Sequence, residues 1–203
     1  MQRCKNCCVS CLCSKVHLEA GYVDQHYNLV VECKKGNRKA HFELYKLYSK
    51  AMYNVAMRIL GNEDEAADVL QEAFIDAFAR ICDFRQESSF GLWIKQIVVN
   101  KSISRFRKRR YEFISVEDAD HDKFLTEEPF DEQELLFKVD QVKRAIQLLP
   151  DGYRIVLSLY LLEGYDHEEI SHILKITENT SRTQFMRAKR KLTELLKCQG
   201  FEI

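Results

Sequence analysis

Three polar side chains near the C-terminal end, Thr183, Gln184 and Arg187, have the types and spacing of a surface that reads DNA bases. A glutamine amide can form paired hydrogen bonds with adenine, and an arginine guanidinium can do so with guanine. All three are displaced from Phe185, which marks the apolar side of the helical pattern. The cations that follow would lie nearer the phosphates and supply charge without sequence choice: Lys189, Arg190 and Lys191.

These side chains fall in a predicted helix-turn-helix. Asp166 followed by Glu169 is typical of a capping box, which opens a short helix to Leu174. A short helix, a tight turn and a longer basic helix can be offered to a DNA major groove. A plain helical hairpin with a solvated basic face is the alternative. After a turn over residues 175–177, the last helix is expected to direct one apolar face inward: Phe185, Ala188, Leu192 and Leu195.

A second group of residues suits unpaired nucleic acid. Trp93 precedes Asn100, Lys101 and Arg105 in a segment that combines aromatic and basic side chains. Cations contact the nucleic-acid backbone, and flat aromatic faces stack on unpaired bases. Trp93 can equally be a core residue, and the cations can equally be a solvated helix end. This group alone therefore does not settle the function.

The chain is neutral overall, with 31 basic and 31 acidic side chains, but its charges are segregated. Residues 91–111 hold seven basic side chains and no acid, and residues 180–197 hold six against one acid. Between them, residues 112–134 hold ten acids and a single lysine. Two cationic surfaces on an acidic tether suit a protein that holds a polyanion at two places.

Length and composition favour two small helical domains. The chain of 203 residues can form one large or two small domains, and the acidic break favours two. A hydrophobic content of 46% is enough for ordinary cores, while seven glycines and two prolines are too few for the turns of a β-sandwich. No apolar run approaches the ~20 residues that cross a bilayer, and the start does not resemble a secretory signal. These features predict a cytosolic protein without membrane insertion.

Hydrophobic periodicity predicts four helices in the first domain. The first covers residues 27–33, and Asn37 can cap the second. The second ends at Gly61, after which Asn62 can cap the third, and the fourth begins near Phe90. The predicted inward faces are Tyr45, Tyr48, Met52, Val55 and Ile59 in the second helix, Ala66, Val69, Leu70, Ala73, Phe74, Ala77, Phe78 and Ile81 in the third, and Leu92, Trp93, Ile94, Ile97 and Val98 in the fourth.

Two more helices are predicted ahead of the helix-turn-helix. The first covers residues 135–149 and stops at Pro150. Asp151 can cap the second, which reaches about Leu162 before Gly164 ends it.

The order of these motifs closely resembles bacterial RNA polymerase sigma factors. Their second conserved region is matched by DVLQEAFIDAF at residues 68–78 and by SFGLWIKQIVVN at residues 89–100. Only the second and fourth regions, joined by a short linker, mark the extracytoplasmic-function (ECF) group. The resemblance runs from about Tyr27 to Leu196. The segments that look like the fourth region are Leu149–Pro150 with Arg154, YDHEEISHIL at residues 165–174 and NTSRTQFMRAK at residues 179–189.

The resemblance implies an all-α fold of two small helical domains joined by an acidic flexible linker, the second with the helix-turn-helix. In the family the linker threads the polymerase cleft. The implied boundaries are a cysteine-rich extension over 1–24, expected to be disordered, a region 2 domain over 25–111, the linker over 112–134 and a region 4 domain over 135–203.

The implied function is that of a sigma factor, which binds core RNA polymerase, directs it to specific promoters and promotes DNA melting. Such a protein is not an enzyme and needs no cofactor. The runner-up is a helix-turn-helix regulator that binds duplex DNA without polymerase. A helical enzyme has no supporting residue cluster. Many ECF factors are held inactive by an anti-sigma factor, a partner class that the sequence does not identify here.

The resemblance assigns Asp68, Gln71 and Glu72 to core-polymerase binding. In the family, the acidic face of the third helix docks on the clamp helices of the largest polymerase subunit. The alternative is a solvated helix surface, and we assign Asp64 and Asp76 to such a surface.

The resemblance also assigns two groups of DNA-binding residues. Asn100 and the loop 84–90 would form a pocket for a base flipped from the non-template strand. Binding of the flipped base offsets the few kcal/mol that unstacking and unpairing cost. The residues implied for melted promoter DNA are Ser88, Ser89, Phe90, Trp93, Asn100, Lys101 and Arg105. Those implied for the upstream duplex element are Thr180, Arg182, Thr183, Gln184, Arg187, Lys189 and Arg190.

Three positions depart from the family pattern. Lys175 stands where the turn usually has glycine, so either Lys175 adopts a left-handed conformation, at ~1 kcal/mol, or the turn differs. Ser181 replaces a usual apolar residue, and Gln184 replaces a frequent arginine. These changes leave the sequence of the upstream element unidentified.

No metal site is predicted, although two groups of residues invite one. His167 and His172 are five apart and diverge by about 140° around a helix, which excludes the pairing of a zinc-protease helix. Two cysteine pairs near the start, Cys4 with Cys7 and Cys8 with Cys11, have zinc spacing, but a disordered tail or a start codon placed too early is the alternative. The other cysteines are expected to be packed thiols: Cys33, Cys82 and Cys198.

Overall fold

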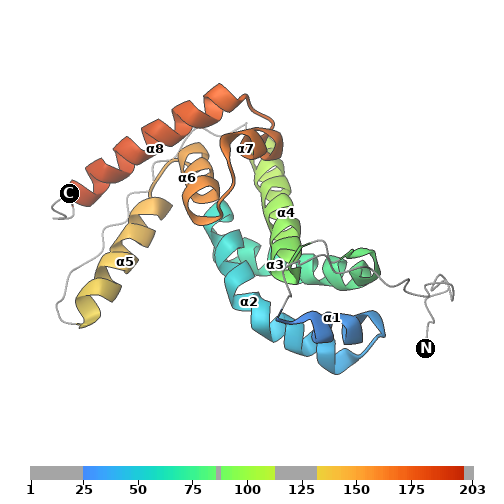
Figure 1. Cartoon of the computed structure of the whole chain (residues 1–203). Coiled ribbons are helices and arrows are strands. Elements are labelled where there is room, and N and C mark those ends of the chain that lie inside the picture. The colour runs from blue at the N-terminus through green and yellow to red at the C-terminus, as the bar shows by residue number, and fades with distance from the viewer. Residues whose placement is uncertain (1–24, 86–87, 113–131, 199–203) are drawn as a thin grey trace.

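Helices form all the regular secondary structure in the part of the chain that the structure describes. The computed structural model describes residues 25–85, 88–112 and 132–198 (Figure 1). The predicted all-α fold is confirmed, whereas the predictions for 1–24 and 113–131 lie outside the described residues. The elements are α1 (Tyr27–Lys34), α2 (Arg38–Leu60), α3 (Glu63–Ala79), the 3-10 turn η1 (Ile81–Asp83), α4 (Phe90–Glu112), α5 (Glu132–Gln147), α6 (Asp151–Leu157), the π-helical turn η2 (Ser158–Leu162), α7 (His167–Leu174) and α8 (Glu178–Cys198).

Polar caps and a glycine set the helix ends in the first half of the chain. The Asn37 side chain accepts a hydrogen bond from the backbone N–H of Lys39 at 3.0 Å and so starts α2. Gly61 ends α2 in the left-handed conformation, with a φ of 67°, and Asn62 caps α3 by accepting from the N–H of Glu65 at 2.9 Å. Each contact satisfies a backbone group that the helix itself leaves unpaired. All three predicted helix ends are confirmed.

Helices α1 to α4 pack around one apolar core, and most of the predicted inward faces are buried in it. Tyr45 is exposed instead, because it rests edge-on against Phe74 at the rim of the core, with ring centroids 4.9 Å apart. Leu92, on the first turn of α4, is also exposed. Tyr48, Phe78, Trp93 and Ile97 are half-buried, and the predicted residues that are buried are Met52, Val55, Ile59, Ala66, Val69, Leu70, Ala73, Phe74, Ala77, Ile81, Ile94 and Val98.

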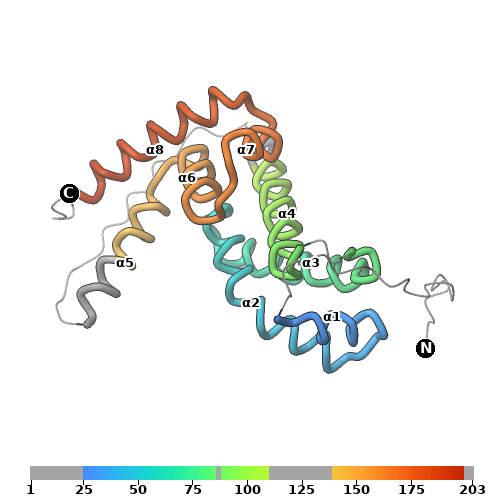
Figure 2. Tube along the Cα trace, viewed as in Figure 1, coloured from blue at the N-terminus to red at the C-terminus, as the bar shows by residue number. Residues whose placement is uncertain are grey.

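Helices α5 to α8 form the second half of the chain. Helices α6 and α7 lie between α8 and the ends of α2 and α4, and α5 packs against α8 (Figure 2). Helix α6 begins at Asp151 with Pro150 as its N-cap, so the prediction that Asp151 caps this helix is wrong. The Asp151 carboxylate instead pairs with Arg154, one turn further along, with an Oδ1–Nη2 distance of 2.6 Å. The helix continues through η2 to Leu162, where it was predicted to end.

A lysine in the left-handed conformation closes the turn of the helix-turn-helix. The capping box of Asp166 and Glu169 opens α7 as predicted, with reciprocal hydrogen bonds of 2.8 and 2.9 Å. Helix α7 then ends at Lys175, which has a φ of 53° and a ψ of 47°. Lys175 therefore adopts the strained conformation that was one of the two predicted alternatives.

Replacing Lys175 with glycine is expected to raise the free energy of unfolding by about 1 kcal/mol, because glycine adopts this conformation without steric strain. Urea denaturation of the full chain measures the change. Lys191→Gly, in the interior of α8, is the matched control and is expected to lower the same free energy by about 1 kcal/mol. No gain from Lys175→Gly would mean that the left-handed lysine carries no strain.

The two halves share an apolar core, which the sequence did not predict. Four residues of the second half are buried in the same cluster as α2, α3 and α4: Ile155, Val156, Leu159 and Ile170. Arg154, which is 6% exposed, donates hydrogen bonds to the backbone carbonyls of Arg58 and Ile59, both at 3.3 Å. These carbonyls end α2, where the helix dipole favours a cation. The second half thus caps a helix of the first.

The cysteines only partly follow the prediction of packed thiols. Burial raises the pKa of Cys33 to about 11, so its side chain is a protonated thiol inside the core. Cys82 and Cys198 are exposed, and the prediction is wrong for both. Cys82 lies in the turn η1, and Cys198 is the last residue of α8.

No helix in the described ranges combines the length and apolar character needed to span a membrane.

Candidate nucleic-acid interface

One face of α3 presents the three residues predicted to bind a protein partner. Asp68, Gln71 and Glu72 are all exposed, because the opposite face of α3 carries its buried stripe. Ile75 follows on the same face and is 67% exposed. Sequence reasoning missed Ile75, although its position outside the buried stripe was a signal that could have found it. The exposed face therefore combines two acids, an amide and one large apolar side chain.

Ion pairs join this acidic face to the cations of α4. Arg105 Nη2 lies 2.7 Å from Glu72 Oε1, and Lys101 Nζ lies 3.7 Å from Glu72 Oε2. Lys101 also contacts Asp76 at 2.7 Å, and this hydrogen bond lowers the pKa of Asp76 below its ordinary value. All of these side chains are partly exposed to solvent, so the pairs add little stability. A ligand of higher charge density could replace either partner.

Phe90 and Trp93 belong to an aromatic cluster at the start of α4. Phe90 is fully buried, with its ring centroid 5.3 Å from that of Tyr48 and 5.7 Å from that of Trp93. Phe90 therefore offers no surface to a base and packs against its aromatic neighbours. Trp93 is half-buried, and the centroid of its ring lies 5.0 Å from that of the Phe84 ring. Of the predicted aromatic contacts, only Trp93 presents part of its ring outward.

The remaining residues predicted to bind melted DNA lie in the loop that precedes α4 and on two sides of α4 itself. Ser88 is exposed, whereas Ser89 Oγ accepts a hydrogen bond from the N–H of Leu92 at 3.2 Å and so caps α4. Asn100 is exposed and stands seven residues, or about two turns, after Trp93, so both lie on one side of the helix. Lys101 and Arg105 face α3 instead, through the ion pairs described above.

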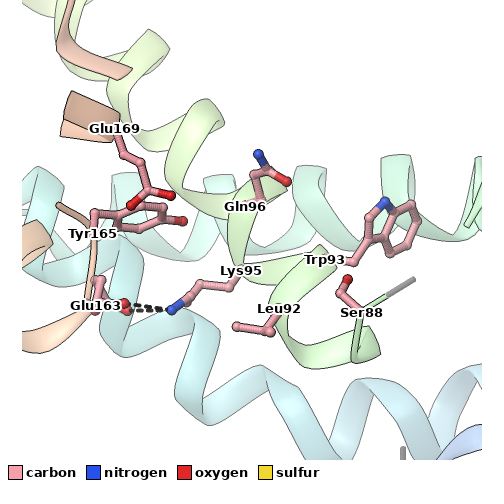
Figure 3. Close-up of a pocket in the computed structure, with 9 residues that line it drawn as sticks. Ser88, Leu92, Trp93, Lys95, Gln96, Glu163, Tyr165 and Glu169 are labelled. Carbon is pink, nitrogen blue, oxygen red and sulfur yellow. Dashed lines mark hydrogen bonds and ion pairs between the residues drawn. The ribbon is translucent and has the colours of Figure 1, made fainter. Parts of the chain in front are cut away.

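A cavity of about 330 Å³ opens beside Trp93, between α4 and the segment that joins η2 to α7. Figure 3 shows Ser88 and Trp93 on the α4 side, and Glu163, Tyr165 and Glu169 on the other. Burial raises the pKa of Tyr165 above its ordinary value, and the nearby carboxylates of Glu163 and Glu169 add to this. Acidic and aromatic side chains of the second half thus line the same cavity as Ser88 and Trp93, two residues predicted to bind DNA.

Glu163 holds the two halves together across this cavity. Its side chain is 5% exposed and accepts hydrogen bonds from the Arg58 guanidinium, through Nε at 3.1 Å and through Nη2. Lys95 Nζ donates to the Glu163 backbone carbonyl at 2.9 Å and lies 5.4 Å from the centre of the Tyr165 ring. About three turns further along α4, Arg107 donates to the Ile173 carbonyl at 2.9 Å. Arg109 Nη2 also lies 3.8 Å from Asp151 Oδ2 of α6, so the second half engages three cations of α4.

Helix α8 exposes most of the residues predicted to bind duplex DNA. Gln184 differs, because it is half-buried and its amide lies close to Gly152 of α6. Sequence reasoning missed Met186, which is exposed on the outer side of the same helix. The six predicted residues that are exposed are Thr180, Arg182, Thr183, Arg187, Lys189 and Arg190.

A polar pair inside the helix-turn-helix accounts for the serine that departs from the family pattern. Ser181 is fully buried, and its Oγ lies 2.9 Å from Nδ1 of His167 at the start of α7. The His167 ring stacks on Tyr160, with centroids 4.5 Å apart, and meets Phe185 edge-on at 5.6 Å. This arrangement satisfies the buried hydroxyl and fixes α8 against α7.

Comparison with known proteins agrees with this architecture. Residues 44–111 match the family Sigma-70 region 2, and residues 140–192 match Sigma-70, region 4. The ECF RNA polymerase sigma factor EcfG of Rhodopseudomonas palustris (strain TIE-1) is 34% identical over 149 residues, which cover 72% of this chain and 80% of EcfG. The ECF RNA polymerase sigma factor SigW of Bacillus subtilis (strain 168) is 29% identical over 177 residues, which cover 83% of this chain and 95% of SigW.

Among solved structures, the fold is similar to the sigma factor RpoE in its complex with the anti-sigma factor NepR from Bartonella quintana. The TM-score is 0.51 at 23% identity, over 76% of this chain and 95% of that one. The two family matches together cover more than half of the 203 residues. The chain belongs to the extracytoplasmic-function (ECF) family of RNA polymerase sigma factors.

Proposed function

We propose that this sigma factor binds core RNA polymerase through the exposed face of α3, with Asp68, Gln71 and Glu72 in contact with the clamp helices of the largest subunit. The observation that carries the proposal is the exposure of all three side chains on one face of a helix whose other face is buried. A duplex-binding regulator that acts without polymerase has no need of such a face.

The melted promoter strand lies, in this proposal, along α4 and the loop before it. Asn100 and the exposed part of Trp93 share one side of α4, and Ser88 is exposed on the loop. Bases can stack on the tryptophan while Lys101 and Arg105 contact the backbone phosphates. Both cations are paired with carboxylates of α3, so phosphates would replace Glu72 and Asp76 as their partners. The binding energy favours strand separation, and no bond is made or broken.

The upstream promoter element lies against the outer side of α8. Thr183 and Arg187 face outward near the start of the helix, where a recognition helix reaches base edges. Lys189 and Arg190 follow them and contact phosphates. Domain boundaries at 25–111 and 135–203 fit this division, with polymerase and melted DNA on the first domain and duplex DNA on the second.

An anti-sigma factor is a further proposed partner, supported by the similar fold of a sigma factor whose structure was solved in complex with one. Because polymerase and promoter DNA are its targets, we place the protein in the cytoplasm.

Transcription in a purified system tests the proposed function. The full chain, added to core polymerase, is expected to start transcription from DNA selected by the reconstituted holoenzyme. Core polymerase alone is the control. A chain that never joins core polymerase, yet binds specific duplex sites unaided, would establish the duplex-binding regulator instead.

A further inference from the structure

Met186 occupies the centre of the outward face of α8 and is 65% exposed. The buried side of the helix is marked by Ser181 and Ala188, which lie about 140° and 160° around the helix from Met186. Single apolar side chains are common on protein surfaces, so exposure alone carries no conclusion. The position of this methionine, in the middle of a basic recognition helix, is the informative observation.

The side chains around Met186 are polar, and most already have partners within the helix. Thr183 Oγ1 donates its hydrogen to the Asn179 carbonyl at 2.8 Å, so this hydrogen is not offered outward. Arg182 pairs with Glu178, and Arg190 Nε lies 3.9 Å from Glu194 Oε1. Met186 is thus an apolar point within a polar face.

The chemistry of the major groove then restricts what Met186 can recognise. A thioether side chain donates no hydrogen bond and is a flexible apolar group. Base edges in the major groove present donors and acceptors, and thymine alone among the four bases adds an apolar group, its C5-methyl. An apolar side chain at the centre of the reading face therefore favours thymine over the other bases.

We propose that Met186 contacts the C5-methyl group of a thymine in the upstream promoter element and so selects a T·A pair at one position. This inference rests on the proposed function, because it requires α8 to read duplex DNA. It adds a specificity-determining residue to the polar residues already assigned to that helix.

Removal of the methyl group from the DNA tests the contact. The holoenzyme of full chain and core polymerase first selects duplex DNA from a random pool. Each thymine of the selected upstream element is then replaced, one at a time, by 2′-deoxyuridine, which lacks only the C5-methyl. One replacement is expected to weaken binding by about three- to fourfold, the change expected for one buried methyl group.

The variant Met186→Ala separates this contact from a general loss of binding. It is expected to bind the thymine probe about as weakly as the unaltered holoenzyme binds the deoxyuridine probe, and to show no further loss on the deoxyuridine probe. Leu47→Ala, which removes a comparably exposed apolar side chain from α2, is the matched control and is expected to keep the full methyl penalty.

Two outcomes overturn the inference while leaving the proposed function intact: no thymine methyl affects binding, or the methyl penalty persists unchanged in Met186→Ala. A holoenzyme that selects no duplex at all overturns both the inference and the proposed role of α8. Thermal unfolding of Met186→Ala is expected to match the unaltered chain, because the side chain packs against no core cluster.

Discussion

Replacing Glu72 with lysine is expected to weaken the binding of core polymerase by about 10- to 100-fold. Glu72 is exposed on the face of α3 that we assign to the clamp helices, and its carboxylate already attracts Arg105 and Lys101. A lysine at this position would place a like charge against cations of the partner, which costs several kcal/mol where the contact is close. Fluorescence anisotropy of the labelled full chain, titrated with core polymerase, measures the affinity.

Two control variants distinguish a polymerase contact from a local effect on α3 and α4. Asp64→Lys makes the same charge change on the first turn of α3, outside the assigned site, and is expected to leave the affinity within about twofold. Arg105→Ala breaks the ion pair with Glu72 but keeps the carboxylate, so core binding is expected to be unchanged. If Arg105→Ala weakened binding as much as Glu72→Lys, the ion pair would be the cause and the assignment of Glu72 would be wrong.

The neighbouring Gln71→Ala variant is expected to weaken core binding by about 2- to 10-fold, the loss of one ordinary hydrogen bond. The same anisotropy titration measures it. Asn54→Ala, which removes an exposed amide from α2, is the control. Unchanged affinity in both Gln71→Ala and Glu72→Lys would remove the α3 face from the proposed polymerase contact.

Local features of the fold were predictable because short-range chemistry decides them. Asn37, Asn62 and the pair Asp166–Glu169 cap helices through their own neighbours, so the residue types and spacing were enough. The buried stripe of α3 followed in the same way from a period of 3.6 residues. The prediction that Asp151 caps a helix was wrong, because an aspartate at the start of a helical segment can also be the first residue of the helix and pair with an arginine one turn further along.

Contacts between the two halves were beyond the reach of periodicity. A hydrophobic pattern shows which side of a helix is buried but does not show what covers it. The stretch from Ile155 to Leu159 reads as the inside of a small domain, yet part of it completes the core of α2 and α4. Phe90 shows the same limit within the candidate site. An aromatic residue beside a tryptophan and several cations has the pattern of a base-stacking group, but only the packing reveals that it is buried.

Glu163 links the halves through Arg58 and Lys95, so its neutralisation is expected to affect both stability and DNA access. Glu163→Gln keeps the shape of the side chain but leaves Arg58 and Lys95 without their carboxylate. Loss of one partner from a buried ion pair lowers the free energy of unfolding by 3–5 kcal/mol, and partial exposure of both cations reduces the expected loss to about 2 kcal/mol. Urea denaturation of the full chain measures this change, and Glu194→Gln, at an exposed pair on α8, is the control, with an expected change within about 0.5 kcal/mol.

The same substitution is expected to increase the affinity of the free chain for single-stranded non-template promoter DNA by severalfold. In the structure, Glu163, Tyr165 and Glu169 line one side of the cavity that Ser88 and Trp93 border on the α4 side, and Lys95 is held by the Glu163 carbonyl (Figure 3). A DNA strand that enters this cavity beside Trp93 must displace that acidic wall, and removal of the Glu163 charge weakens the contacts that hold the wall in place. Anisotropy with a labelled single strand measures the gain. A variant that loses stability yet binds the strand no better would show that the second half does not obstruct the DNA-binding side of α4.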